Sequence, residues 1–90
     1  MRAVITVLGC DRVGIIAGVT AVLADTNTNI LDISQTIMSD DIFTMLMIVD
    51  LSASRVDSQE LQEKLAQKGK ELGVEVRLQR EEIFRSMHRI

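Results

Sequence analysis

The spacing of hydrophobic residues changes several times along this 90-residue chain, and each change marks a new structural element. Residues 2–8 are rich in β-branched side chains and end at Gly9, which predicts a strand. From Ile15 onward, apolar residues recur every three or four positions, as they do on one face of a helix. This helix should end near residues 25–27, where Asn27 can adopt the left-handed conformation that often follows a helix. Its apolar positions are Ile15, Ile16, Val19, Val22 and Leu23.

Two strands are predicted next, and they form a hairpin. Apolar and polar residues alternate over residues 29–39, which is the period of a half-buried strand. Two aspartates at 40–41 suit a tight turn, and residues 42–51 are apolar on both faces over most of their length. The apolar side of the first of these two strands consists of Leu31, Ile33 and Ile37.

The remaining residues predict another helix, another strand and a short C-terminal helix. Asp57 and Glu60 have the spacing of a capping box, so a helix should begin there, and Gly73 is well placed to end it. Residues 74–79 alternate again, which predicts a fourth strand with one polar face. Residues 81–89 place apolar side chains on one helical face, with acidic residues first and arginines last, as the helix dipole favours.

The predicted order is therefore β-α-β-β-α-β followed by a short helix. With right-handed crossovers, this order closes into a ferredoxin-like α+β fold, a four-stranded antiparallel sheet with both helices on one face. We expect one domain over residues 1–90, with the core in residues 1–79 and a helical tail in residues 80–90. The hydrophobic content of 47% is sufficient for one packed core.

This topology also predicts self-association. The second and fourth strands are the edges of the sheet, and an exposed edge can pair with another strand. The second strand contains neither Pro nor Lys, the residues that commonly block such pairing. Two copies related by a two-fold axis would join into one eight-stranded sheet, so we expect a homodimer, and a higher oligomer is possible.

Charge and composition exclude several partners. The net charge is −3 and the isoelectric point is about 5.0, which disfavours nucleic acid and anionic membrane surfaces. No apolar run approaches the roughly 20 residues that cross a bilayer. The single cysteine, Cys10, cannot form an internal disulfide, which is typical of a reducing compartment. We therefore expect a cytoplasmic protein that binds neither nucleic acid nor membrane.

The chain has no recognisable catalytic or cofactor-binding motif. It lacks the glycine-rich phosphate-binding motif, Cys10 has no second cysteine to complete a metal site, and His88 has no sequence neighbour that would make it a general base. The first strand carries no aromatic residue of the kind that stacks on RNA bases. We expect no catalytic residue, no metal and no cofactor, and hence a protein that is not an enzyme.

The first strand-to-helix loop is the best candidate for a binding site. The first amides of a helix have no partner within the helix and favour a carboxylate, and Gly14 lets a ligand approach the backbone. Asp11 could accept a hydrogen bond from an ammonium group, so the loop could hold the α-carbon end of an amino acid. The alternative is purely structural: Asp11 caps the helix and Gly14 makes the turn. From these residues alone the structural alternative is the stronger one.

Two segments carry a resemblance to a known family. Residues 8–19 (LGCDRVGIIAGV) and 29–36 (NILDISQT) resemble the ACT domain, and in particular the small stand-alone ACT proteins of bacteria and archaea. The resemblance extends over essentially the whole chain, including residues 83–90. It implies a regulatory module that binds an amino acid at a homodimer interface, where the first loop of one subunit meets the second strand of the other.

The resemblance also implies which residues form the site. The implied ligand-binding residues are Asp11, Arg12, Val13, Gly14, Ile15, Asn29 and Ile30. At Gly9 the chain departs from those members in which a side chain helps to hold the ligand. Two hypotheses follow: a sensor in which a small molecule bridges two subunits, or an assembly module without a ligand that acts through a partner regulator or enzyme.

Overall fold

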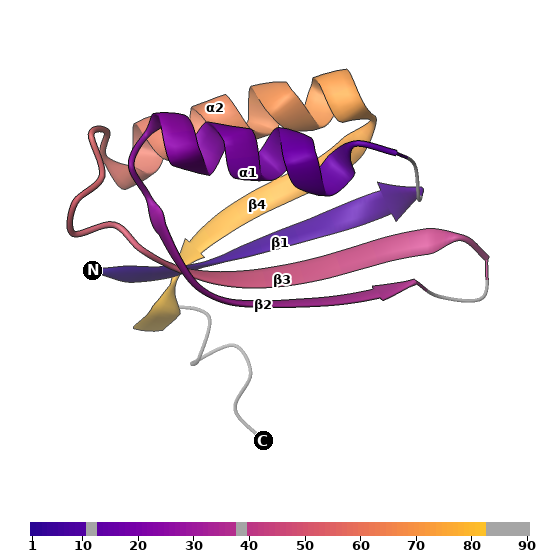
Figure 1. Cartoon of the computed structure of the whole chain (residues 1–90), viewed down its shortest axis with the longest axis horizontal. Coiled ribbons are helices and arrows are strands. Elements are labelled where there is room, and N and C mark those ends of the chain that lie inside the picture. Colours follow the sequence, from indigo (N-terminus) through magenta and orange to yellow (C-terminus); the bar gives the residue numbers. More distant parts are fainter. Residues whose placement is uncertain (11–12, 38–39, 83–90) are drawn as a thin grey trace.

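Four strands and two helices form the order predicted from the sequence, in a computed structural model that describes residues 1–10, 13–37 and 40–82 (Figure 1). The strands make one antiparallel sheet in the order β2-β3-β1-β4. This arrangement confirms the ferredoxin-like α+β fold. The elements are β1 (Arg2–Cys10), α1 (Ile15–Asp25), β2 (Asn29–Ile37), β3 (Ile42–Asp50), α2 (Ser58–Leu72) and β4 (Val74–Arg80).

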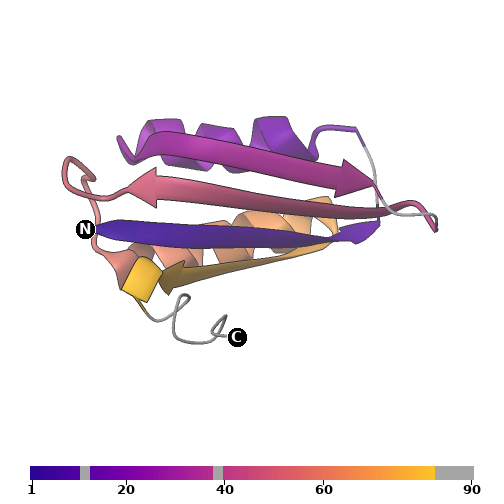
Figure 2. The same ribbon diagram turned by 90° about the horizontal axis from the view of Figure 1, so that it is seen from below.

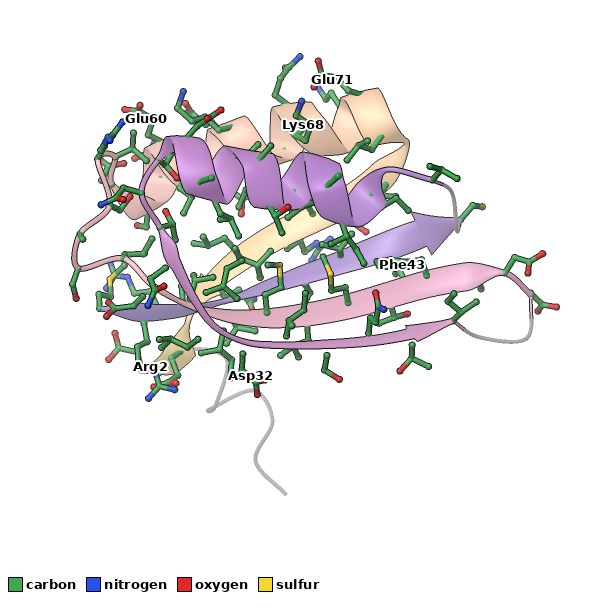
Figure 3. The ribbon with its side chains drawn as sticks, in the orientation of Figure 1. Arg2, Asp32, Phe43, Glu60, Lys68 and Glu71 are labelled. Atoms are coloured by element: carbon green, nitrogen blue, oxygen red, sulfur yellow. The ribbon has the colours of Figure 1, made fainter. Side chains whose placement is uncertain are left out.

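Both helices cover the same face of the sheet. Figure 2 shows α1 on the side of β2 and α2 on the side of β4. Alternate residues of the strands point into the layer between sheet and helices. Figure 3 shows Phe43 of β3 on the helix side and Asp32 of β2 on the opposite side. The buried side chains of the two central strands on that side are Ala3, Ile5, Val7, Phe43, Met45, Met47 and Val49.

Helix α1 packs through the residues that its spacing predicts. Ile15, Val19 and Leu23 are buried, whereas Ile16 lies at the surface. The helix ends as expected, because Asn27 has a positive φ of 58° directly after the last turn. Its side chain then donates a hydrogen bond to the Ala53 carbonyl at 3.0 Å, which ties the start of β2 to the loop before α2.

Helix α2 has the predicted ends. The Asp57 carboxylate accepts a hydrogen bond from the Glu60 amide at 2.8 Å, which caps the first turn. Gly73 ends the helix with a φ of 75°. Inside the helix, Gly69 is buried against β4, and a Cβ at this position would lie 2.7 Å from the Val74 carbonyl oxygen. The glycine therefore permits a close approach of helix and strand that no other residue allows.

The prediction that β2 is half buried is wrong for this chain. Ile33 and Ile37 pair with buried residues of β3, so they lie on the helix side of the sheet, yet they are 44% and 58% exposed. Figure 2 shows α1 running along this outermost strand, yet in the single chain both side chains keep a large part of their surface exposed. Leu31 is also exposed, at a register shift between Ile30 and Asp32. The alternation predicts a strand correctly but does not reveal what covers it.

The C-terminal end differs by one residue from the predicted boundary. β4 extends to Arg80 and residues 81–82 begin a helical turn. Arg2 and Glu81 form an ion pair across this junction, with 3.2 Å between Nε and Oε2. The predicted helical tail falls mostly on residues 83–90, which lie outside the described residues. In the described part of the chain, no helix combines the length and hydrophobicity needed to span a bilayer.

Candidate functional site

The start of α1 forms one half of the predicted site. Gly14 is the N-cap residue, with a φ of 95°, and its carbonyl accepts the first helical hydrogen bond from the Gly18 amide at 2.9 Å. A Cβ at Gly14 would have no neighbour within 4 Å among the described residues, which leaves space for a ligand beside this backbone. The amides of residues 15–17 have no acceptor within the helix. This end of α1 can therefore receive an anionic group.

The side chains around this helix start have different roles. Val13 is fully exposed, at 101% of its reference area, so it is free to contact a ligand or a second subunit. Ile15 is buried in the core, and only its backbone amide can contribute to binding. Asp11 and Arg12 lie outside the described residues, so both the ligand role of Asp11 and its alternative role as a helix cap stay predictions.

The start of β2 forms the other half. Asn29 is exposed and lies opposite Asp50 of β3, whereas Ile30 is half buried against the core. Behind them, the Thr28 amide donates a hydrogen bond to the Leu23 carbonyl at 2.8 Å, which fixes the turn between α1 and β2. A hollow of about 450 Å³ borders Asn29 and Asp50 at this end of the molecule.

The Asp50 carboxylate, opposite Asn29, carries a stable negative charge. The hydroxyl and the amide of Ser52 donate hydrogen bonds to Asp50 at 2.6 and 2.9 Å, and these bonds lower the pKa of the Asp50 carboxyl below its usual value. The amino group of Met1 lies 3.7 Å from the same carboxylate and acts in the same direction. Asp50 is therefore ionised at neutral pH, and its carboxylate favours a cationic group near the start of β2.

The two halves of the predicted site are not together in one chain. Gly14 and Asn29 lie at opposite ends of α1 (Figure 1). The helix has 11 residues, so its ends are about 16 Å apart at a rise of about 1.5 Å per residue. A small ligand cannot contact both ends of such a helix at once.

The space beside Gly9 is already filled. A Cβ at Gly9 would lie 2.6 Å from Val74 Cγ1 and 3.0 Å from Val74 Cα in the neighbouring strand. Val74 thus occupies the volume that a side chain at position 9 would need. Packing against β4 therefore favours glycine at position 9 in this chain.

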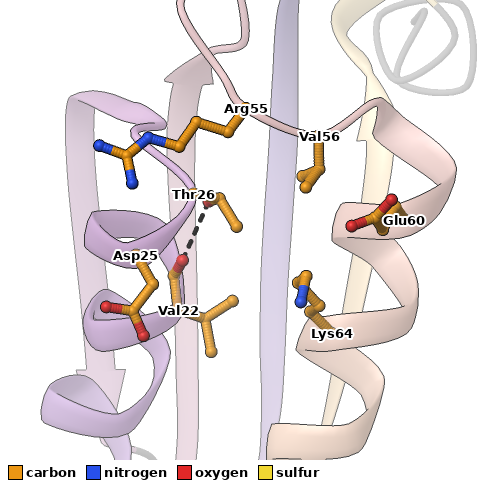
Figure 4. Close-up of a pocket in the computed structure, with 7 residues that line it drawn as sticks. All are labelled: Val22, Asp25, Thr26, Arg55, Val56, Glu60 and Lys64. Atoms are coloured by element: carbon orange, nitrogen blue, oxygen red, sulfur yellow. Dashed lines mark hydrogen bonds between the residues drawn. The ribbon is translucent and has the colours of Figure 1, made fainter.

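A second cleft lies between the C-terminal end of α1 and the beginning of α2, and the sequence alone did not reveal it (Figure 4). Its volume is about 280 Å³, and Thr26 donates a hydrogen bond from its hydroxyl to the Val22 carbonyl in its wall. No single stretch of sequence could indicate this cleft, because residues 22–26 and 55–64 come together only in the fold. The lining residues are Val22, Asp25, Thr26, Arg55, Val56, Glu60 and Lys64.

The described residues contain no group of three or more His, Cys, Asp or Glu side chains that could hold a metal ion. Cys10 is exposed and is not in a disulfide.

Comparison with known proteins identifies the family. The ACT domain profile matches residues 2–79, which is most of the chain. The chain belongs to the ACT domain family. A UPF0237 protein of Methanocaldococcus jannaschii is 55% identical to this ACT domain over 89 residues, covering 99% of this chain and 98% of the relative. The resemblance seen in the loop and second strand is thereby confirmed.

Solved structures agree with this assignment. An ACT domain protein from Streptococcus pneumoniae superimposes with a TM-score of 0.81 at 40% identity, over 93% of each chain. The regulatory subunit of aspartate kinase from Thermus thermophilus superimposes with a TM-score of 0.67 at 28% identity, over 87% of this chain and 50% of that one. The ACT domain is a regulatory, non-catalytic module found in ligand-binding regulators.

Proposed function

We propose that this ACT domain is a sensor that binds an amino acid between two copies of the chain, paired through their β2 edges. The observation that carries the proposal is the separation of the two half-sites at opposite ends of α1. One chain cannot close such a site around a small ligand. A second copy can supply the missing half.

A two-fold pairing of β2 strands brings complementary halves together. β2 begins at the C-terminal end of α1 and ends near the start of α1 (Figure 1). In an antiparallel pair, the start of one strand lies beside the end of the other. The start of β2 in one copy therefore lies near the α1 start of the other, and the pair contains two equivalent sites.

The surface around β2 supports this pairing. Large apolar side chains are rarely exposed in clusters unless they meet a partner. Here three of them lie on β2 and a fourth lies in the first turn of α1. These exposed residues are Ile16, Leu31, Ile33 and Ile37.

The chemistry of the two halves suits an amino acid. The free amides at the start of α1, next to Gly14, favour a carboxylate. At the start of β2, the Asn29 side chain offers an oxygen to an ammonium group, and the Asp50 carboxylate, which already attracts the Met1 amino group, favours a second cation nearby. Asp11 could add a second acceptor from the loop. Because the ligand contacts both copies, its binding must also tighten the dimer.

The proposal is tested by a thermal-shift scan against the twenty amino acids, with size measurements on the same samples. A ligand at 100 times its Kd adds about 2.7 kcal/mol of stability. For a domain of this length, that free energy raises Tm by more than about 10 °C. We expect one selective amino acid that raises Tm and strengthens the dimer.

Matched variants then locate the ligand. Asn29→Ala should abolish the Tm shift and leave the dimer intact, because Asn29 is exposed and contributes nothing to the core. Arg55→Ala, in the cleft between the helices, should leave the shift unchanged. The reverse pattern would place the ligand in the cleft between the helices and contradict the proposed site.

One observation favours the alternative, an assembly module without a ligand. Val74 fills the space beside Gly9, so this chain has no side chain at a position that contributes to ligand binding in some ACT domains. A flat thermal-shift scan on a stable dimer would support that alternative. The dimer would then act through a partner regulator or enzyme, bound to a surface that Asn29→Ala leaves unchanged.

A further inference from the structure

We propose that α2 closes the β4 edge of the sheet, chiefly through the side chain of Gln62, so that β2 is the edge that accepts a second copy of the chain. The identity of the partner at β2 rests on the proposed function, whereas the closure of β4 does not. The consequence is an assembly that ends at two copies.

The sheet has two outer strands, β2 and β4, which the topology alone does not distinguish. In an outer strand, every second residue directs its amide and carbonyl away from the sheet. Such groups pair readily with a strand of another molecule unless something covers them.

Gln62 covers the middle of the β4 edge. Its side-chain oxygen accepts a hydrogen bond from the Leu78 amide at 2.6 Å, and its side-chain nitrogen donates one to the Val76 carbonyl at 3.4 Å. A carboxamide offers one acceptor and a donor side by side, as a peptide group does. The side chain therefore occupies the hydrogen-bonding positions that a neighbouring strand would use.

The backbone of α2 covers the beginning of the same edge. A Cβ built on Gly69 would lie 2.7 Å from the Val74 carbonyl oxygen and 3.6 Å from the Val76 amide nitrogen. These two groups belong to alternate residues of β4, like the two groups that Gln62 binds. From Val74 to Leu78, the outward-facing backbone of β4 thus lies against α2.

Within residues 1–10, 13–37 and 40–82, nothing covers the β2 edge as α2 covers β4. Among the described hydrogen bonds, one joins a side chain to its backbone, from the Ile33 amide to the Asp32 carboxylate at 2.8 Å. Asp32 belongs to β2 itself and is exposed, so its side chain can turn away when another strand arrives. The side chains of Ile33 and Ile37 are exposed along this strand and add apolar surface to any pairing there.

Closure of one edge limits the size of the assembly. When two copies pair through β2, the outer strands of the combined sheet are both β4. If these were open, pairs would add to pairs and form an extended ribbon. Because α2 covers them, growth stops at the pair.

Substitution of Gln62 tests the proposal. Gln62→Ala removes the cover at Val76 and Leu78, and we expect it to form species larger than the wild-type protein, increasing with concentration, in sedimentation velocity. Gln67→Ala is the matched control, because Gln67 is an exposed glutamine elsewhere on the same helix. A folded Gln62→Ala variant with the wild-type sedimentation profile at every concentration would overturn the proposed limit on assembly.

Hydrogen exchange tests the closure without reference to the dimer. The Leu78 amide should exchange roughly fivefold faster, or more, in Gln62→Ala than in the wild-type protein, because it loses its acceptor. Equal exchange in both proteins would overturn the closure itself. If the wild-type protein is a monomer, the proposed dimer is contradicted. The exchange rates of the Leu78 amide still test the closure of β4 in that case. If Gln62→Ala does not fold, Gln62→Met keeps the length of the side chain and removes both hydrogen bonds.

Discussion

Gly69 and Gly9 lie where two segments of backbone approach too closely for a side chain. In both cases the neighbour is Val74, the first residue of β4: its carbonyl oxygen faces Gly69 and its side chain faces Gly9. The start of β4 therefore packs directly against both α2 and β1, with no space for a side chain at either glycine. Gly14 is different, because its backbone has a positive φ and no described residue lies within 4 Å of the position of a Cβ.

The contact at Gly69 leads to a prediction that opposes helix propensity. Alanine in place of glycine inside a helix normally adds about 1 kcal/mol of stability. In Gly69→Ala the new methyl group would meet a backbone oxygen at 2.7 Å, which cannot move without shifting β4. We expect a net loss of about 1–3 kcal/mol, measured by urea unfolding.

Gly18→Ala is the control for this prediction. Its methyl group would also be close to a neighbour, at 2.8 Å, but that neighbour is the terminal methyl of Leu72, which can rotate. Gly18→Ala should therefore be clearly more stable than Gly69→Ala. Equal stability of the two variants would show that β4 yields to the new methyl group as easily as Leu72 does.

The helices and strands were predictable because each has local signals that the fold retains. The Asp57 cap, the Gly73 termination and the left-handed Asn27 are properties of short segments, and the structure contains all three. The exposure of β2 was not predictable, because it depends on how distant elements pack against the outer strand. Periodicity identifies which residues share a face, and only the arrangement of elements determines whether that face is covered.

The exposed side of β2 makes a prediction about pairing. Changing Ile33 and Ile37 together to lysine places like charges along the edge where two strands would meet. Charge repulsion of this kind costs several kcal/mol, so the dissociation constant of the dimer should increase at least roughly hundredfold. Sedimentation equilibrium measures this change directly.

The control adds the same charge elsewhere. Gln59 and Gln67 are exposed on α2, so Gln59→Lys with Gln67→Lys should leave the dimer as strong as in the wild-type protein. Circular dichroism should report the same secondary structure for all the proteins compared. A dimer that survives lysines at Ile33 and Ile37 would show that another surface joins the copies.

At the scale of the whole molecule, the fold determines which predicted residues can act together. The sequence identified the loop at Gly14 and the strand start at Asn29, because each has its own local pattern. It did not reveal that α1 separates them by its full length. It also gave no indication of the cleft between the helix ends, whose residues are distant in sequence. The sequence shows which residues could bind a ligand, but it does not show how far apart they lie in the folded chain.

The separation of the half-sites has a genetic consequence. In the proposed dimer, Asp11→Ala should damage the loop half and Asn29→Ala the strand half, so each homodimer should have two defective sites. In a heterodimer of the two products, both defects should fall in one of the proposed sites and leave the other site intact. When the two variant proteins are mixed and re-equilibrated, each heterodimer should regain one working site, which is about half a site per subunit. In one cell, the two alleles should therefore complement each other. Two alleles damaged in the same half should not complement each other. Titration of each mixture with the amino acid found in the thermal-shift scan measures the number of working sites.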